Sequence, residues 1–126
     1  MAVLDHYLQK RDALYDPKAT PAKLSALGKI FFEAKAYSDA LDFYERAKDE
    51  DGIALIKKMA LDEGDTFILA HMERLDTKSV DLEEWEHTGE IARQKGRESM
   101  ALFAEERIAE RNGEGQADPG EEPIEE

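Results

Sequence analysis

Small and large apolar residues recur at helical spacing in one segment of the chain, and this spacing is the strongest constraint on its fold. The residues that carry it are Leu24, Leu27, Gly28, Phe31, Tyr37, Ala40, Tyr44 and Ala47. Two helices that cross closely need small side chains where their backbones touch and bulky side chains where they interlock. Gly28, Ala40 and Ala47 supply the small positions. The segment therefore predicts a pair of packed helices.

Capping residues set the expected ends of these two helices. Thr20 followed by Pro21 starts the first, because the threonine hydroxyl can accept a hydrogen bond from a free backbone N–H and proline has no N–H to satisfy in the first turn. The chain turns near Lys35, and Ser38 is the expected cap of the second helix, which runs to about Asp49.

Later glycines and aspartates divide the rest of the chain in the same way. Gly64 and Gly96 are expected to end helices, and Asp65 is expected to cap the next one. Asp81 with Glu84 three residues later resembles a capping box, in which each residue bonds the backbone of the other.

The predicted fold is all-α, with about seven helices. The expected segments are a leading helix over 2–14 and three hairpins over about 20–49, 51–76 and 80–111. A chain of 126 residues suits a single core, so one helical domain over 1–112 is expected. Residues 113–126 hold six acids, no Lys or Arg and almost nothing apolar, which predicts a disordered acidic tail.

The first hairpin resembles the tetratricopeptide repeat (TPR), a two-helix unit that binds other proteins. Compatible residues return 61 positions later as Trp85, Gly89, Ala92 and Ala101. That third hairpin is a degenerate copy, since Thr88, Glu105 and Ile108 replace Leu27, Tyr44 and Ala47. The middle hairpin fits few positions, and the offset is shorter than two repeats of about 34 residues. The resemblance implies a right-handed superhelix of TPR-like hairpins, and a compact irregular helical bundle is the alternative.

The resemblance also implies where a partner binds, because TPR proteins usually hold a peptide or helix in a groove lined by the first helix of each hairpin. The corresponding positions here are Lys29, Phe32 and Glu33, then Lys58, then Glu83, Glu86, Glu90 and Arg93. Phe31 takes the buried position and adjacent helical residues face different ways, so Phe32 is expected to be an exposed apolar anchor.

Three acids of this set share one face of a helix. Glu83, Glu86 and Glu90 follow three- and four-residue spacing, which suits a ligand that carries Lys or Arg. An ordinary solvated helix face is the alternative. The whole chain holds 30 acidic and 17 basic residues, a net charge of −13, which disfavours nucleic acid and anionic membranes as partners.

The sequence shows no pattern typical of catalysis or of metal binding. Glu84 and His87 form one Glu-x-x-His motif, whereas di-iron bundles need two such motifs and two more glutamates. No phosphate-binding glycine loop or nucleophile elbow is present. The aromatic residues Trp85, Phe67 and Phe103 are expected to lie in the core. We therefore expect no cofactor, no metal and no enzymatic activity.

These observations predict a non-catalytic adaptor that binds a protein or peptide through a mixed-charge groove. The chain has no cysteine and no apolar run of about 18 residues, so a cytoplasmic protein is expected. A self-associating structural module is the main alternative, because no polar capping helix follows Arg111 and an exposed end can pack on a second copy. The remaining alternative is a metal-dependent enzyme.

Overall fold

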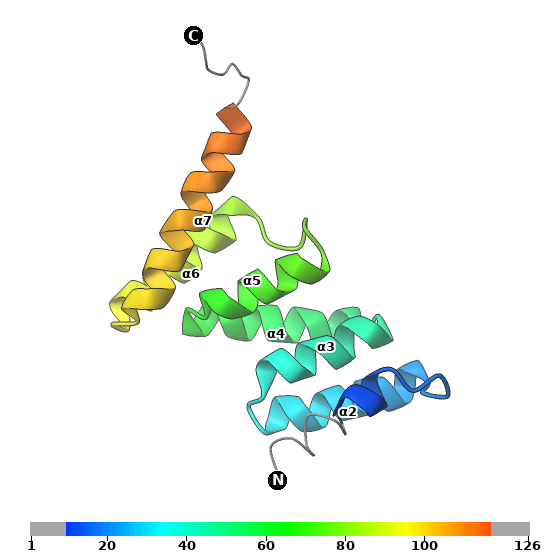
Figure 1. Ribbon diagram of the computed structural model, residues 1–126. Helices are drawn as coiled ribbons and strands as arrows, with labels where there is room; N and C mark the ends of the chain where they lie inside the picture. Colours follow the sequence, from blue (N-terminus) through cyan, green and yellow to red (C-terminus); the bar gives the residue numbers. More distant parts are fainter. Residues whose placement is uncertain (1–9, 117–126) are drawn as a thin grey trace. The chain divides into compact units, whose positions relative to one another are not determined.

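The computed structural model describes residues 10–116, and every regular element in that range is a helix (Figure 1). The helices are α2 (Pro21–Glu33), α3 (Tyr37–Ala47), α4 (Glu50–Glu63), α5 (Thr66–Leu75), α6 (Leu82–Gln94) and α7 (Glu98–Gln116), and residues 10–14 are also helical. The all-α prediction is confirmed for this part of the chain. Residues 2–9 of the predicted leading helix and residues 117–126 of the predicted tail lie outside the described residues.

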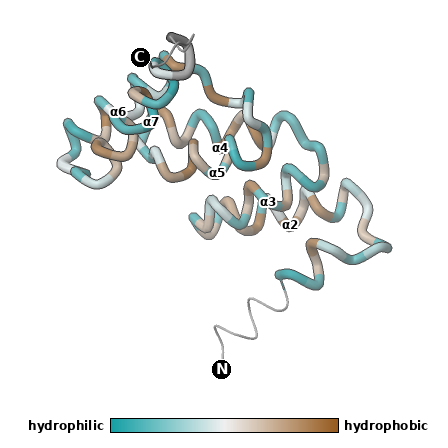
Figure 2. The backbone as a smooth tube through the Cα atoms, turned by 45° about the horizontal axis from the view of Figure 1, so that its top comes forward, coloured by the Kyte–Doolittle hydropathy of each residue, from teal (hydrophilic) through white to brown (hydrophobic). Residues whose placement is uncertain are grey.

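The helices gather into two compact units, where the sequence had suggested one domain. The N-terminal unit is residues 1–58 and the C-terminal unit is residues 59–126, so the boundary falls within α4. In the N-terminal unit α2 packs on α3, and in the C-terminal unit α5, α6 and α7 pack on one another. Hydrophobic and hydrophilic residues alternate along these helices, which lets each unit bury one face of its own helices (Figure 2). The superhelical arrangement of hairpins stays a prediction.

Most of the predicted caps are present. Thr20 Oγ1 accepts a hydrogen bond from the Lys23 backbone N–H at 3.2 Å, and an Asp65 carboxylate oxygen accepts one from the Ile68 N–H at 3.1 Å. Asp81 and Glu84 form the reciprocal capping box of α6, with distances of 2.8 and 2.9 Å. These helix starts are confirmed.

The predicted cap at Ser38 is wrong. Helix α3 begins at Tyr37, and Ala36 precedes it without a side-chain hydrogen bond to the helix. The cause is the end of α2, where Lys35 adopts a left-handed conformation with φ of 65° and the Ala36 N–H bonds the Phe31 carbonyl at 2.9 Å. This tight turn lets the next helix start before Ser38.

The last helix is longer than predicted. We expected it to end at about Arg111, before Asn112 and Gly113, but α7 continues to Gln116. Gly64 and Gly96 end helices with φ of 77° and 75°, whereas Gly113 has no positive φ. A helical glycine costs about 1 kcal/mol relative to alanine, so it weakens a helix without ending it unless it turns left-handed.

The core of the N-terminal unit is built around one tyrosine and a pair of stacked phenylalanines. The rings of Phe31 and Phe43 stack with centroids 5.2 Å apart. A Cβ added to Gly28 would lie 2.9 Å from the ring of Tyr44, and one added to Gly52 would lie 2.6 Å from Tyr44 Cγ. The buried Tyr44 ring therefore lies between α2 and α4 and needs a glycine on each side, which confirms that Gly28 is a close-packing position.

The core of the C-terminal unit is centred on Trp85, which is fully buried as predicted. A Cβ added to Gly89 would lie 2.8 Å from Ala104 Cβ, so α6 and α7 approach closely there. Phe103 contacts the rings of both Trp85 and Phe67. The assignment of Phe67 to the core is wrong, since 47% of its surface is exposed.

Asp49 caps α4 and ties it to α2. Its carboxylate accepts hydrogen bonds from the Gly52 N–H at 3.0 Å and from the Ser25 hydroxyl at 2.8 Å, and these bonds lower the pKa of Asp49. A lowered pKa in the folded state stabilises the fold above the unfolded pKa of about 3.9, and this contribution is lost as the pH falls through the folded value.

We expect the substitution Asp49→Ala to lower the free energy of unfolding of the N-terminal unit by about 1 kcal/mol at neutral pH. The difference from wild type should shrink as the pH falls from about 4 through the lowered pKa of the folded state, because the folded carboxylate stays ionised until that lower pH. All four tyrosines lie in residues 1–58, so tyrosine absorbance during urea unfolding measures this unit. The control Asp51→Ala removes an acid from the same helix end but keeps the cap, and it should change stability by less than about 0.5 kcal/mol. Equal urea midpoints for Asp49→Ala and wild type would contradict the prediction.

Candidate binding site

The eight predicted groove residues are divided between the two units. Lys29, Phe32, Glu33 and Lys58 belong to the N-terminal unit, and Glu83, Glu86, Glu90 and Arg93 belong to the C-terminal unit. Among them, Glu86, Glu90 and Arg93 line the same depression.

The N-terminal residues do not include the exposed aromatic anchor that we expected. Lys29 and Glu33 are exposed on α2, and Lys58 is exposed on α4. Phe32 is partly buried, because its ring packs edge-on against Tyr37 with centroids 5.3 Å apart. The short turn between α2 and α3 places Tyr37 in the first turn of α3, where it covers part of Phe32.

The C-terminal residues form one side of a depression of about 200 Å³ between α6 and α7, which we call the α6–α7 groove. Its lining residues are Glu86, Gly89, Glu90 and Arg93 of α6 and Ala101, Ala104, Glu105 and Ile108 of α7. The floor of the groove is formed by small residues, Gly89, Ala101 and Ala104. The larger side chains of the lining form its two sides. Glu83 lies one turn earlier on α6 and is not part of this lining.

The walls of the α6–α7 groove carry an excess of negative charge. Three carboxylates, those of Glu86, Glu90 and Glu105, face one guanidinium, that of Arg93. Arg93 forms an ion pair with Glu105 of the opposite helix. Because this pair neutralises itself, Glu86 and Glu90 leave the groove with a net charge of about −2.

In the N-terminal hairpin, the position that corresponds to the α6–α7 groove is filled. There the Tyr44 ring lies against Gly28, and Gly52 of α4 lies against the other side of that ring. Glu105 stands 61 residues after Tyr44, and Gly89 stands 61 residues after Gly28. An exposed glutamate thus replaces the buried tyrosine, which leaves a hollow in the C-terminal hairpin where the N-terminal one is packed.

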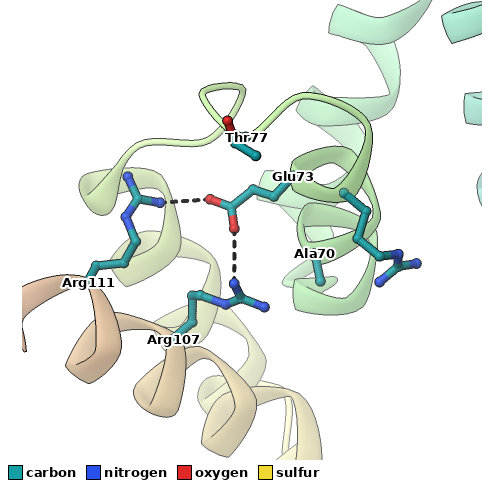
Figure 3. Close-up of a pocket in the computed structure, with 6 residues that line it drawn as sticks. Ala70, Glu73, Thr77, Arg107 and Arg111 are labelled. Atoms are coloured by element: carbon teal, nitrogen blue, oxygen red, sulfur yellow. Dashed lines mark hydrogen bonds and ion pairs between the residues drawn. The ribbon is translucent and has the colours of Figure 1, made fainter. Parts of the chain in front are cut away.

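A second site surrounds Glu73, a buried carboxylate that sequence reasoning missed. Trp85 Nε1 donates a hydrogen bond to Glu73 Oε2 at 2.9 Å, and Arg111 Nη1 donates to the same oxygen at 2.7 Å. Arg107 Nη1 lies 3.5 Å from Oε1 (Figure 3). Glu73 is only 9% exposed, so these partners, and not bulk water, surround its carboxylate oxygens.

A pocket of about 340 Å³ opens beside this carboxylate, which we call the Glu73 pocket. Its lining residues are Ala70, Glu73, Arg74, Thr77, Arg107 and Arg111. The one local signal for it is that Arg107 and Arg111 share a face of a helix by their spacing of four. Nothing local connects them to Glu73, which lies more than 30 residues earlier.

The described residues contain no group of three His, Asp or Glu side chains placed to hold a metal ion. Glu84 of the Glu-x-x-His motif accepts a hydrogen bond from the Asp81 N–H in the capping box, and His87 is exposed on α6. Within residues 10–116, no helix has the length and apolarity needed to cross a membrane.

Comparisons with known proteins assign no family. No family model matches the chain, and neither a curated protein nor a solved structure matches it. The TPR resemblance rests on the residues named above and stays a prediction.

Proposed function

We propose that the protein is a non-catalytic binding module whose α6–α7 groove holds a basic helical segment of another protein. The observation that supports this is the open, acidic α6–α7 groove. In the N-terminal hairpin the corresponding position is filled by the ring of Tyr44, which packs against Gly28 and against Gly52 of α4. A module of this kind recognises a partner without chemistry. Its proposed location is the cytoplasm, because the chain has no cysteine and no apolar run of about 18 residues.

The shape and charge of the groove favour this partner over others. Gly89, Ala101 and Ala104 give the groove a floor of small residues, over which a partner helix can lie between the larger side chains of α6 and α7. Ile108 adds an apolar contact at the wall. Glu86 and Glu90 would accept charge-assisted hydrogen bonds from Lys or Arg, and the net charge of −13 would attract a basic segment from a distance.

The test is a selection of helical peptides from a displayed random library, with the full chain as bait. We expect the selected peptides to be rich in Lys and Arg. The variant Glu86→Lys/Glu90→Lys should weaken their binding at least about tenfold by calorimetry, because two carboxylate contacts become repulsive. The matched control Glu83→Lys/Glu106→Lys makes the same change in net charge on exposed residues outside the groove, and it should alter binding less than about threefold.

Three outcomes would overturn the proposal. Selected peptides without a basic bias would remove the argument from charge. Equal losses in both variants would show that bulk charge, and not the groove, determines binding. A dimer in sedimentation velocity that Glu86→Lys/Glu90→Lys dissociates would assign the groove to a second copy of the chain, as in the self-associating alternative.

A further inference from the structure

The Glu73 pocket carries positive charge in a strongly acidic protein. Arg74, Arg107 and Arg111 line it together with a single carboxylate, that of Glu73. One of the three positive charges is therefore neutralised inside the pocket. Glu110 lies outside the lining, 3.9 Å from Arg107 Nε, and is largely exposed, so it offsets the remaining charge only weakly.

Two of these arginines are already fixed in place. The guanidinium of Arg107 lies over the rings of both Trp85 and Phe103, 5.6 Å from each centroid. Arg111 Nη1 donates to the Val80 carbonyl at 3.1 Å as well as to Glu73. A ligand that contacts them loses little free energy to ordering their side chains.

The carboxylate of Glu73 does not use all the donors that these side chains offer. Each guanidinium has five N–H groups in a planar fork, and Glu73 contacts Nη1 of each. The side chains of Arg107 and Arg111 are about one third exposed, at 33% and 32%. Arg74 is exposed and forms no ion pair with any residue that the structure describes, and the exposed Thr77 adds a hydroxyl.

We propose that the Glu73 pocket binds a phosphoryl dianion, either inorganic phosphate or the phosphate of a small ester. Its two negative charges match the two positive charges that Glu73 leaves uncompensated. Its tetrahedral oxygens can bond several planar guanidinium groups and the Thr77 hydroxyl at once, which a monovalent carboxylate cannot do as fully. The volume of about 340 Å³ leaves space for an ester group beside the phosphate.

The only tryptophan of the chain reports on this pocket. Trp85 donates to Glu73 and lies under Arg107, so its fluorescence and its indole N–H resonance should respond when an anion contacts the arginines. The full chain is titrated at about pH 8, where phosphate is largely dianionic. The probes are inorganic phosphate, phenyl phosphate and acetate, with sodium chloride at equal ionic strength as the reference.

We expect a saturable change with the phosphate probes that sodium chloride does not produce. Tighter binding of phenyl phosphate would assign the pocket to an ester, and tighter binding of phosphate would assign it to the free anion. Arg74→Gln should weaken binding about tenfold and Thr77→Val several-fold, because each removes a direct contact. Both residues are exposed and outside the Glu73 hydrogen bonds, so the helix content by circular dichroism should remain unchanged.

The control Lys78→Gln removes an exposed positive charge from the same loop without touching the pocket lining. It should change the affinity less than about twofold. The proposal fails if phosphate gives no saturable change beyond sodium chloride, if acetate binds as tightly as phosphate, or if Lys78→Gln weakens binding as much as Arg74→Gln.

Discussion

Replacing Glu73 with alanine is expected to lower the free energy of unfolding of the C-terminal unit by about 3 kcal/mol. The substitution leaves the buried indole N–H of Trp85 without its acceptor and removes the carboxylate that faces Arg107 and Arg111. Breaking a buried ion pair from one side typically costs about 3–5 kcal/mol, and the arginines here are one third exposed, which favours the lower end. Trp85 fluorescence during urea unfolding measures this unit, since no other tryptophan is present.

Two further variants separate the charge of Glu73 from its shape. Glu73→Gln keeps an oxygen that can accept from Trp85 but removes the charge, so about half of the loss is expected. Glu106→Ala removes an exposed carboxylate from α7 and should change stability by less than about 0.5 kcal/mol. A Glu73→Ala protein as stable as wild type would show that water replaces the carboxylate without cost, and that the network contributes nothing to the fold.

Helix starts were predictable where a capping side chain was present and no neighbouring turn changed where the helix begins. Thr20, Asp65 and Asp81 act on backbone groups three residues away, so the sequence beside them contains all the relevant information. Ser38 carried the same signal and failed, because a left-handed lysine three residues earlier closes α2 and starts α3 first. Whether a glycine ends a helix depends on its φ, which the sequence around Gly113 does not reveal.

The candidate sites were only partly predictable, because each combines residues from distant parts of the chain. Glu86, Glu90 and Arg93 share a helix face, and the TPR resemblance placed them in a binding surface. The sequence already shows Glu105 in place of Tyr44, but it does not show that Tyr44 packs against two glycines while Glu105 borders a hollow, because these contacts involve distant residues. The Glu73 pocket depends on contacts between residues up to 38 positions apart, and no local pattern predicts them.

The substitution Gly52→Ala is expected to destabilise the N-terminal unit by about 2 kcal/mol, although alanine is the better helix former. The gain in helix propensity is at most about 1 kcal/mol. The new Cβ would lie 2.6 Å from both Cγ and Cε1 of Tyr44, a ring that is buried between α2 and α4. Overpacking of a tight core typically costs about 1–3 kcal/mol, and a ring held by its neighbours has little room to rotate away. Urea unfolding followed by tyrosine absorbance measures the effect.

The ring itself can be tested as the cause by repeating the substitution in a Tyr44→Leu background. Leucine lacks the ring atoms that the new Cβ would meet, so Gly52→Ala should then cost less than about 0.5 kcal/mol, and the double-mutant cycle should show strong coupling between the two positions. Gly113→Ala is the control for helix propensity, because a Cβ there meets no atom within 4 Å; it lies in the C-terminal unit, so Trp85 fluorescence follows its unfolding, and it should cause no loss of stability. An equal cost of Gly52→Ala in both backgrounds would mean that Tyr44 does not fill the seam between α2 and α4. The contrast between a filled N-terminal seam and an open α6–α7 groove, on which the proposed binding of a basic helix rests, would then be lost as well.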